Sequence, residues 1–278
     1  MTDADGTGTL YIVSTPIGNL EDMTPRAVRT LASVSAILCE DTRHSGPMLA
    51  HFGITTARLS YHAHNEAERT PEVTARLTAG ESMALISDAG TPLLSDPGAR
   101  LVAAARAAAI PVVPIPGASA LLAGLVASGL DVSRFTFFGF LPRSGGERTA
   151  VLDAIAAAPH VSVCYEAPPR VAGTLGALAG LVEPERRAVV ARELTKRFEE
   201  HRTGTVAELA AYYTSSPPRG EIVLLIDGAP TRTHDLAGAE AFAQAAAASG
   251  RPARETMLQL VEQFGLSRNA AYRLAHAP

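Results

Sequence analysis

The chain has 278 residues, of which 47% are hydrophobic and 19% are charged, and its formal net charge is −4. This length allows about two domains with a sizeable core, and this composition excludes an intrinsically disordered chain. The weakly acidic balance excludes a generic polyanion binder, so any contact with nucleic acid must come from local basic patches.

Cysteine usage and the first residues point to the cytoplasm. Cys39 and Cys164 each lie in an apolar run, which favours buried thiols over a disulfide or a metal site. Residues 1–8 are polar and acidic and lack the pattern of a signal peptide, and the Ala-rich runs are too short and too interrupted by Arg to span a bilayer. We therefore expect a cytoplasmic protein without a membrane segment.

The first half of the chain alternates short apolar runs with helix-favouring segments. This alternation predicts a mainly parallel sheet with helices on both faces. Thr24 and Pro25 mark the start of the first helix, and Asp96 and Pro97 are expected as N-cap and first residue of the fourth. The predicted strands are 10–13, 34–38, 83–86 and 112–115, and the predicted helices are 25–32, 46–51, 66–77, 97–109 and 120–127.

Polar or glycine-rich loops follow the carboxyl ends of these strands. The longest, Ser87–Gly98, holds two Gly, two Pro and two Asp. A bare strand-to-helix connection needs only about 2–6 residues, so this loop is expected to contact a ligand. Open α/β sheets bind ligands outside the carboxyl ends of their strands, which predicts one crevice for all of these loops. The shorter loops are Ser14–Leu20, Glu40–His44 and Pro116–Ala120.

The second half begins after a junction at 130–133 and has more hairpin character. It predicts a mixed sheet, in which 189–196 and 198–201 are expected to pair as a hairpin. A helix is predicted to end near Ala157. The predicted strands are 135–140, 161–165, 189–196, 198–201 and 221–227.

A helical tail follows a linker at 228–235. Helices are predicted at 236–250 and in two segments of 251–276, which are broken at 264–266 with Ser267 as N-cap. The tail has the length of a helix-turn-helix, but such turns are common in plain helical packing. Its excess of Arg over Glu favours a basic appendage that helps to hold RNA over a reader of DNA sequence.

Familiar catalytic motifs are missing from the sequence. It contains neither G-x-G-x-x-G after the first strand nor G-x-x-x-x-G-K-[ST], and Ser119 lies in Pro-Gly-Ala-Ser-Ala rather than in G-x-S-x-G. His62 and His64 are interpreted as loop histidines rather than metal ligands, and no metal site is expected. A glycine-lined crevice remains, which suggests a group transferase with a nucleotide-like cofactor.

Seven sequence blocks occur in a distinctive order and spacing. They are Ser14–Leu20, Glu40–His44, Ser87–Pro92, Pro116–Ala120, Gly139–Pro142, Tyr165–Glu166 and Ala191–Lys196. Together they resemble the tetrapyrrole-methylase superfamily and, more narrowly, the bacterial small-subunit ribosomal RNA cytidine 2′-O-methyltransferases. The resemblance covers about residues 9–228, and one departure is Ser14, where many members carry Gly.

The resemblance implies an α/β fold of the two-domain class III (tetrapyrrole-methylase-like) methyltransferases, each domain a mixed sheet flanked by helices, with a small helical C-terminal tail. The domains implied are an N-terminal domain at 9–130, a C-terminal domain at 131–228 and the linker with its tail at 229–278. S-adenosylmethionine would lie in the cleft between the first two. The implied partners are small-subunit ribosomal RNA or the assembled 30S subunit, and a second copy of the chain as a homodimer, with no DNA and no membrane.

The resemblance also implies a set of cofactor-binding residues on the loops and on one strand end. A carboxylate such as that of Asp88 suits a zwitterionic ligand that bears a sulfonium, and loop N–H groups suit its polar atoms. The implied residues are Pro16, Ile17, Gly18, Asp88, Gly90, Thr91, Ser119, Ala120, Tyr165 and Glu166.

Methyl transfer to a ribose hydroxyl is an in-line displacement that depends on positioning of the reactants. The hydroxyl is a poor nucleophile, so a general base or a neighbouring cation is expected to help. The block Glu40–His44 is favoured for the acceptor side, but the sequence does not identify the base. The candidates for base or acceptor positioning are Glu40, Asp41, Arg43, His44 and Lys196, with Glu166 and Glu193 as further carboxylates.

Three functions remain open on the sequence. The first is a ribosomal RNA ribose methyltransferase, and the second is a methylase of a corrin or porphyrin precursor. The third is a non-catalytic RNA-binding or ribosome-assembly protein that keeps the fold. Salt-sensitive RNA binding separates the first and third from the second, and methyl transfer separates the first two from the third.

Overall fold

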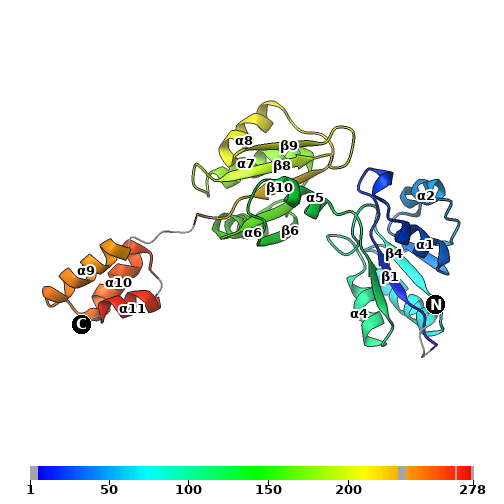
Figure 1. The fold of residues 1–278 in the computed structure, drawn as a ribbon, viewed down its shortest axis with the longest axis horizontal. Coiled ribbons are helices and arrows are strands. Elements are labelled where there is room, and N and C mark those ends of the chain that lie inside the picture. The colour runs from blue at the N-terminus through cyan, green and yellow to red at the C-terminus, as the bar shows by residue number, and fades with distance from the viewer. Residues whose placement is uncertain (1–5, 231–235, 267, 277–278) are drawn as a thin grey trace. The chain divides into compact units, whose positions relative to one another are not determined.

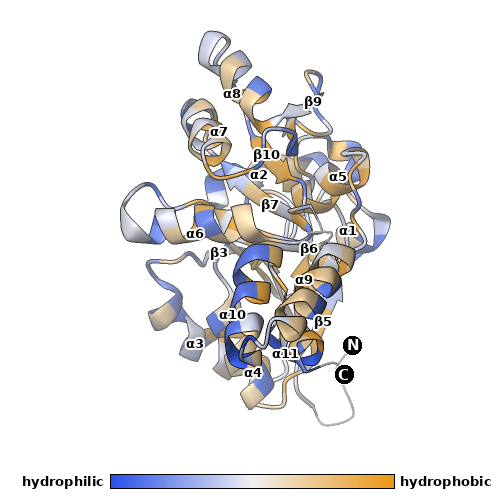
Figure 2. Cartoon of the chain, turned by 90° about the vertical axis from the view of Figure 1, so that its left-hand side faces the viewer, coloured by the Kyte–Doolittle hydropathy of each residue, from blue (hydrophilic) through white to orange (hydrophobic). Residues whose placement is uncertain are grey.

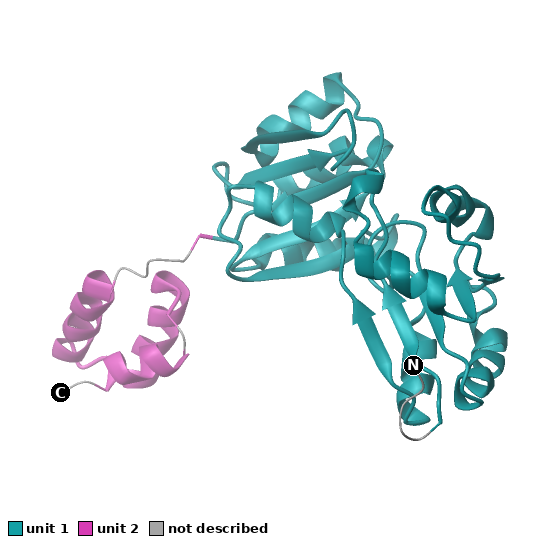
Figure 3. Ribbon diagram, turned by 45° about the vertical axis from the view of Figure 1, so that its right-hand side comes forward, with its two compact units in different colours: residues 1–229 teal, residues 230–278 magenta. Residues whose placement is uncertain are grey.

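The protein is described here by a computed structural model that covers residues 6–230, 236–266 and 268–276. The chain forms two compact units, Met1–Ala229 and Pro230–Pro278, which are coloured separately in Figure 3. The division into domains at 9–130, 131–228 and 229–278 stays a prediction.

Within the described residues, five strands form the first sheet, in the order β3-β2-β4-β1-β5, of which Figure 1 labels β1 and β4. Each pairing between them is parallel, with one isolated antiparallel bridge between Thr15 and Gly90, so this sheet is more parallel than the resemblance implies. The sequence misses β3, because it is short and partly exposed and shows no apolar pattern. The strands are β1 (Leu10–Val13), β2 (Ala36–Cys39), β3 (Arg58–Ser60), β4 (Met83–Ile86) and β5 (Val112–Ile115).

Helices cover both faces of this sheet, as predicted. Leu31 of α1 and Leu49 of α2 pack in one buried cluster, and Leu77 of α3 and Leu101 of α4 pack in another. A fifth helix, α5, follows β5. The bounds are α1 (Pro25–Ser33), α2 (Thr42–His51), α3 (Glu66–Thr78), α4 (Ala99–Ala107) and α5 (Ala120–Ala127), with a short 3₁₀ helix η1 (Leu20–Asp22) before α1.

The starts of three helices test the predicted caps. Thr24 caps α1 as expected, since its hydroxyl accepts the N–H of Ala27 at 3.1 Å. Helix α2 begins four residues before the predicted position 46, because the side chain of Asp41 caps it. The prediction that Asp96 and Pro97 open α4 is wrong. The N-cap there is Gly98 at φ +126, so the helix begins at Ala99 and leaves Asp96 in the loop.

The second sheet is mixed, as predicted, and has the order β6-β7-β10-β8-β9 in the described part of the chain. Strands β6 and β7 run parallel, and the other pairs are antiparallel. The predicted hairpin exists, but its second strand lies at 200–205 and not at 198–201. The bounds are β6 (Phe135–Phe140), β7 (Val161–Glu166), β8 (Arg187–Arg192), β9 (Glu200–Thr205) and β10 (Ile222–Ile226).

Different helices cover the two faces of the second sheet. Leu121 and Leu125 of α5 pack on one face, and Figure 2 colours α5 and β10 as mostly hydrophobic. Helices α6, α7 and α8 supply the buried cluster on the other face. The sequence predicts α6 but neither α7 nor α8. For α7, Gly173 and Gly176 disfavour a helix when the segment is considered in isolation. The bounds are α6 (Gly145–Ala157), η2 (Pro168–Arg170), α7 (Val171–Ala179) and α8 (Val206–Ser215).

The second unit contains the helices α9 (Leu236–Ala248), α10 (Ala253–Phe264) and α11 (Arg268–Ala275). They pack through a small cluster that includes Leu260 and Leu266. The predicted break is confirmed, because Gly265 adopts φ +65 and ends α10. The predicted N-cap Ser267 and the linker residues 231–235 lie outside the described residues. Among the described helices, none has the length and hydropathy that a membrane crossing requires.

Candidate functional site

A pocket of about 400 Å³ opens in the first unit, between the carboxyl ends of the first sheet and one end of the second. The loops after β1, β2, β4 and β5 all contribute to it, which is the convergence that their positions in the sequence predict. Nine of the residues singled out in the sequence line it, namely Ile17, Glu40, Asp88, Gly90, Thr91, Ser119, Ala120, Tyr165 and Glu166.

Direct contacts hold the loops of the first sheet together. Thr15 and Gly90 exchange two backbone hydrogen bonds, at 2.9 and 3.1 Å. The hydroxyl of Thr91 donates to the carbonyl of Ala118 at 3.1 Å and lies 3.1 Å from the hydroxyl of Ser14. Gly90 has φ +77, and a Cβ there would lie 3.1 Å from Ile17. The conformation and the close approach both explain why a glycine stands in this loop.

Three acidic residues line the pocket from the loops of the first sheet, namely Glu40, Asp88 and Asp96, and Glu166 and Glu221 line it from the second sheet. Burial and the charges of Asp96 and Asp88 raise the pKa of Glu40. Burial also raises the pKa of Asp96, partly offset by a hydrogen bond with Ser87. An acidic pocket of this kind favours a ligand that carries positive charge.

The other residues of the block Glu40–His44 lie outside the pocket. The carboxylate of Asp41 accepts from the backbone and the guanidinium of Arg43, and the pair lies 2.8 Å apart on the surface. These hydrogen bonds lower the pKa of Asp41 to about 2. Arg43 and His44 are exposed, and Asp41, Arg43 and His44 are absent from the pocket lining. Of this block, Glu40 alone among the described residues lines the pocket.

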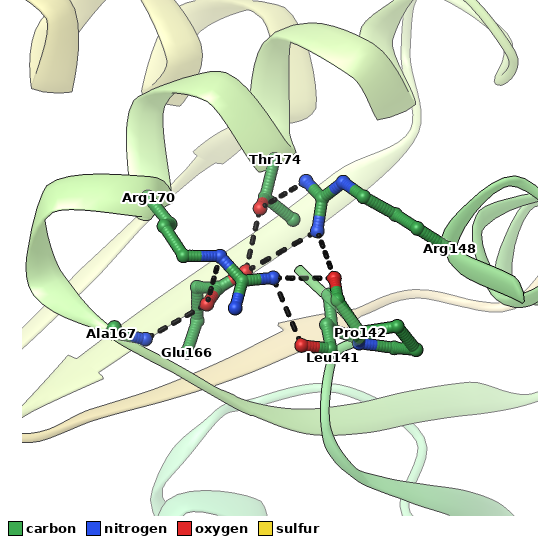
Figure 4. Close-up of polar contacts among 7 residues, drawn as sticks. All are labelled: Leu141, Pro142, Arg148, Glu166, Ala167, Arg170 and Thr174. Atoms are coloured by element: carbon green, nitrogen blue, oxygen red, sulfur yellow. Dashed lines mark hydrogen bonds and ion pairs between the residues drawn. The ribbon is translucent and has the colours of Figure 1, made fainter. Parts of the chain in front are cut away.

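Glu166 has a different environment from the one predicted for it. Its backbone lies at the pocket, but its carboxylate is fully buried in a polar network (Figure 4). Oε2 accepts the hydroxyl of Thr174 at 2.7 Å, and Oε1 accepts the N–H of Ala167 at 2.8 Å and lies 3.2 Å from Nε of Arg170. Arg148 lies 3.8 Å away. The carboxylate of Glu166 is therefore not available to a ligand in the pocket.

Lys196, Pro16 and Gly18 are also absent from the lining. The ammonium of Lys196 donates to Glu193 and to Glu221, each at 3.0 Å. Burial disfavours its charge, but these two hydrogen bonds outweigh burial and raise its pKa. Its aliphatic stem occupies the space that a Cβ on Gly18 would need, and Gly18 has φ +152. Lys196 therefore joins the loop after β1 to the second sheet.

The sequence does not single out the remaining lining residues. The sequence predicts Asp96 as a helix N-cap. Phe140 belongs to the block Gly139–Pro142, for which the sequence predicts no role in binding. The strand residues Ile222 and Val223 look like any buried apolar pair, so no local signal marks them. The lining residues that receive no individual role from the sequence are Ala89, Leu94, Ser95, Asp96, Phe140, Ala167, Pro168, Leu194, Gly220, Glu221, Ile222 and Val223.

Comparison with known proteins gives a family match and close full-length relatives. The family model of the tetrapyrrole (corrin/porphyrin) methylases matches residues 9–210. The ribosomal RNA small subunit methyltransferase I of Synechocystis sp. is 46% identical over 271 residues, which cover 96% of this chain and 97% of that protein. The protein of the same name from Haemophilus influenzae is 42% identical over 282 residues and covers 99% of each chain.

Solved structures share the fold at low sequence identity. A cobalt precorrin-4 methyltransferase superimposes with a TM-score of 0.60 at 16% identity, over 79% of this chain and 94% of that chain. The uroporphyrin-III C-methyl transferase of Thermus thermophilus, complexed with S-adenyl homocysteine, gives 0.58 at 20% identity, over 79% and 97% of the two chains. At these identities the likeness extends to the fold alone.

Proposed function

Because the chain belongs to the tetrapyrrole (corrin/porphyrin) methylase family, we propose that it methylates the 2′-hydroxyl of a cytidine ribose in small-subunit ribosomal RNA, with S-adenosylmethionine as methyl donor. The observation that carries this proposal is the match, over nearly the whole chain, to relatives named ribosomal RNA small subunit methyltransferase I. The acidic pocket at the convergence of four loops supports it as the place where the reaction occurs.

The pocket fits the proposed cofactor. Its volume of about 400 Å³ falls within the range of about 300–1,000 Å³ that small-molecule sites occupy. Asp88 and Asp96 suit the positive charge of the donor, and the close-packed glycine Gly90 allows the backbone to approach it. When bound, S-adenosylmethionine supplies a methyl group on a positively charged sulfur, and the sulfur becomes neutral as the methyl group leaves.

We assign roles in cofactor binding to the lining residues that the sequence singled out. Asp88, Gly90 and Thr91 form one side, with Ser119 and Ala120 on the facing loop. Tyr165 contributes its ring, while Glu166 contributes backbone only, since its carboxylate is buried in the arginine network. Pro16, Ile17 and Gly18 shape the loop beside them, where Lys196 packs against Gly18.

Glu40 is the proposed general base. It lines the pocket, and a raised pKa makes a carboxylate a better proton acceptor at neutral pH. Asp41 is paired with Arg43, and Glu193 with Lys196. Glu166 is engaged in its own network, and Lys196 is held in its charged form by two carboxylates. The proton of the ribose hydroxyl would pass to Glu40 as the oxygen takes the methyl group.

The small helical unit has a proposed part in holding RNA. Arg254, Arg268 and Arg273 are exposed on α10 and α11. Arginines of this kind contact phosphates, and such binding weakens as salt rises. We further propose that the protein works in the cytoplasm as a homodimer and that its substrate is the ribosomal RNA or the assembled 30S subunit.

The test is methyl transfer from tritiated S-adenosylmethionine to small subunits from a strain that lacks this protein. Label on a cytidine ribose 2′-oxygen, mapped by nuclease digestion and abolished by Asp88→Ala, is the expected result. Cofactor binding with no label on subunits or on naked RNA, but with label on a corrin or porphyrin precursor, would point to the small-molecule methylase. RNA binding that Asp88→Ala leaves unchanged, without any transfer, would indicate a non-catalytic RNA-binding protein.

A further inference from the structure

Strand β6 contains a β-bulge directly before the pocket. Phe137 pairs with Val163, and Phe140 pairs with Tyr165, so β6 advances three residues while β7 advances two. The extra residue is accommodated beside Gly139, which has φ +63. Bulges of this kind change the direction of the side chains that follow them and occur often next to binding sites.

The bulge decides which face of the sheet receives Phe140. Side chains alternate along a strand, so a regular strand would place Phe140 on the face of Phe138, which packs against the cluster of α6, α7 and α8. With one residue added, Phe140 takes the opposite face, together with Phe137 and Tyr165. A ring that would have been buried in the core lines the pocket instead.

The ring of Phe140 is open to solvent although it lies in the pocket wall. The residue is 63% exposed, and its ring centroid lies 5.3 Å from that of Tyr165. Tyr165 in turn lies 5.0 Å from Phe137, which completes an aromatic row along one face of the sheet. An exposed phenyl group gains hydrophobic stabilisation when a ligand covers it.

The backbone that follows Phe140 is held in place, and the backbone before it is closely packed. Arg170 donates to the carbonyls of Leu141 and Pro142, at 2.9 and 2.7 Å, and Arg148 donates to that of Pro142 at 3.1 Å. Both arginines surround the buried carboxylate of Glu166, as Figure 4 shows. On the other side, a Cβ at Gly139 would lie 3.0 Å from Ser95. Because this backbone is fixed before a ligand binds, less freedom is lost when a ligand stacks on the ring of Phe140.

We propose that Phe140 is a stacking platform for a planar nucleobase, either the adenine of the cofactor or the cytosine of the acceptor nucleotide. The inference rests on the proposed function, because that function supplies the two bases. Proteins recognise unpaired bases by stacking them on aromatic rings, and this ring stands in the wall of a pocket whose carboxylates suit the charged part of a ligand.

The test compares Phe140→Leu with a matched control, Phe198→Leu. Phe198 is 64% exposed, but it lies in the turn between β8 and β9 and does not line the pocket. Binding of S-adenosylmethionine is measured by calorimetry, and binding of small-subunit RNA by filter retention. Loss of one stacked base corresponds to about 5- to 150-fold weaker binding. Phe140→Tyr keeps the ring and should restore the affinity, and thermal melting confirms that each variant is folded.

Each outcome decides the proposal. If Phe140→Leu weakens cofactor binding by at least fivefold relative to Phe198→Leu, the base is the adenine. If it weakens RNA binding instead, the base belongs to the acceptor. If both affinities stay within twofold of the control, the platform does not exist. Absence of methyl transfer by the wild-type protein would refute the proposed function separately, because both binding measurements are made without turnover.

Discussion

The carboxylate of Asp88 accepts a hydrogen bond from the backbone N–H of Asp41, with 3.2 Å between Oδ1 and the nitrogen. Asp88 follows β4 and Asp41 follows β2, so this contact joins the proposed cofactor loop to the proposed acceptor loop. Asp88 therefore has a structural role beside its proposed role in cofactor binding, and a test of the second must leave the first intact.

Asp88→Asn separates these two roles. The asparagine side chain keeps an oxygen that can accept from Asp41 but carries no charge. We expect the melting temperature to change little and S-adenosylmethionine to bind about 10- to 150-fold more weakly, as for the loss of a hydrogen bond to a charged group. Calorimetry measures the affinity, and Asp88→Ala serves as the variant that loses both roles. Unchanged affinity in Asp88→Asn would exclude a charge interaction with the cofactor.

Glu40→Gln should remove the proposed general base. We expect kcat to fall by about 10²- to 10⁴-fold, while the affinity for S-adenosylmethionine changes little. The acid limb of the pH profile of kcat should disappear in this variant, because the wild-type limb follows the protonation of Glu40. His44→Gln, outside the pocket in the first turn of α2, is the control and should stay within twofold of the wild type. A normal kcat in Glu40→Gln would exclude this residue as the base.

The raised pKa of Glu40 also predicts the pH dependence of stability. A carboxyl group whose pKa is raised in the folded state binds its proton more tightly there, so its contribution is full below the unfolded pKa of about 4.5 and is lost as pH rises through the folded pKa. Glu40→Gln should therefore raise the free energy of unfolding at pH 7, and this gain should shrink toward pH 4. Urea denaturation at the two pH values checks the sign.

Asp41 should behave in the opposite way. Its pKa is lowered to about 2 by its hydrogen bonds with Arg43, so its contribution is present above the unfolded value of 3.8 and is lost as pH falls toward about 2. Asp41→Asn should lower stability at pH 7 and have a smaller effect at pH 2. An equal effect at both pH values would exclude the charge of Asp41 as its source, because asparagine keeps an oxygen that can cap the helix.

Glu166→Gln should destabilise the protein strongly. Its carboxylate is fully buried, and the side chains of Arg148 and Arg170 are only 18% and 27% exposed, so the change leaves two poorly solvated cations without their counter-charge. Breaking a buried ion pair costs about 3–5 kcal/mol. Glu72→Gln, which breaks the exposed pair with Arg69, is the control and should cost about 0–1 kcal/mol. Similar losses in both variants, measured in urea, would argue against a stabilising network.

Neutralising the arginines of α11 should reduce the salt sensitivity of RNA binding. Each phosphate contact that is lost lowers the slope of log K against log salt concentration by about 0.7 to 0.9. Replacing Arg268 and Arg273 by Gln should therefore lower the slope by up to about 2. Arg69→Gln, on α3 in the first unit, is the control. An unchanged slope in the double variant would exclude these arginines from the RNA interface.

The sequence by itself determined the strands of the first half other than β3, and the loops that follow them. Apolar runs flanked by Gly, Pro and Asp predict strands at 10–13, 83–86 and 112–115, and the structure has them at these positions. The convergence of their loops on one pocket was also predictable, because the carboxyl ends of parallel strands lie at one edge of a sheet. The residues of those loops also carry the resemblance that indicates the family.

Only the tertiary structure decided what several of these residues do. Glu166 and Lys196 are charged residues in recognised blocks, yet each is held by partners that other elements supply: Thr174 of α7 for Glu166, and Glu221, which precedes β10, for Lys196. Asp96 looks like a helix cap, but Gly98 opens the helix and leaves Asp96 at the pocket. From the sequence, Phe140 is one residue of an aromatic strand, with nothing to mark it for the pocket. In the structure, the β-bulge places its side chain on the opposite face of the sheet. Local patterns specify strands and turns, because those depend on neighbours in the chain. The charge state of a carboxylate and the exposure of a ring depend on neighbours in space, which only the folded chain brings together.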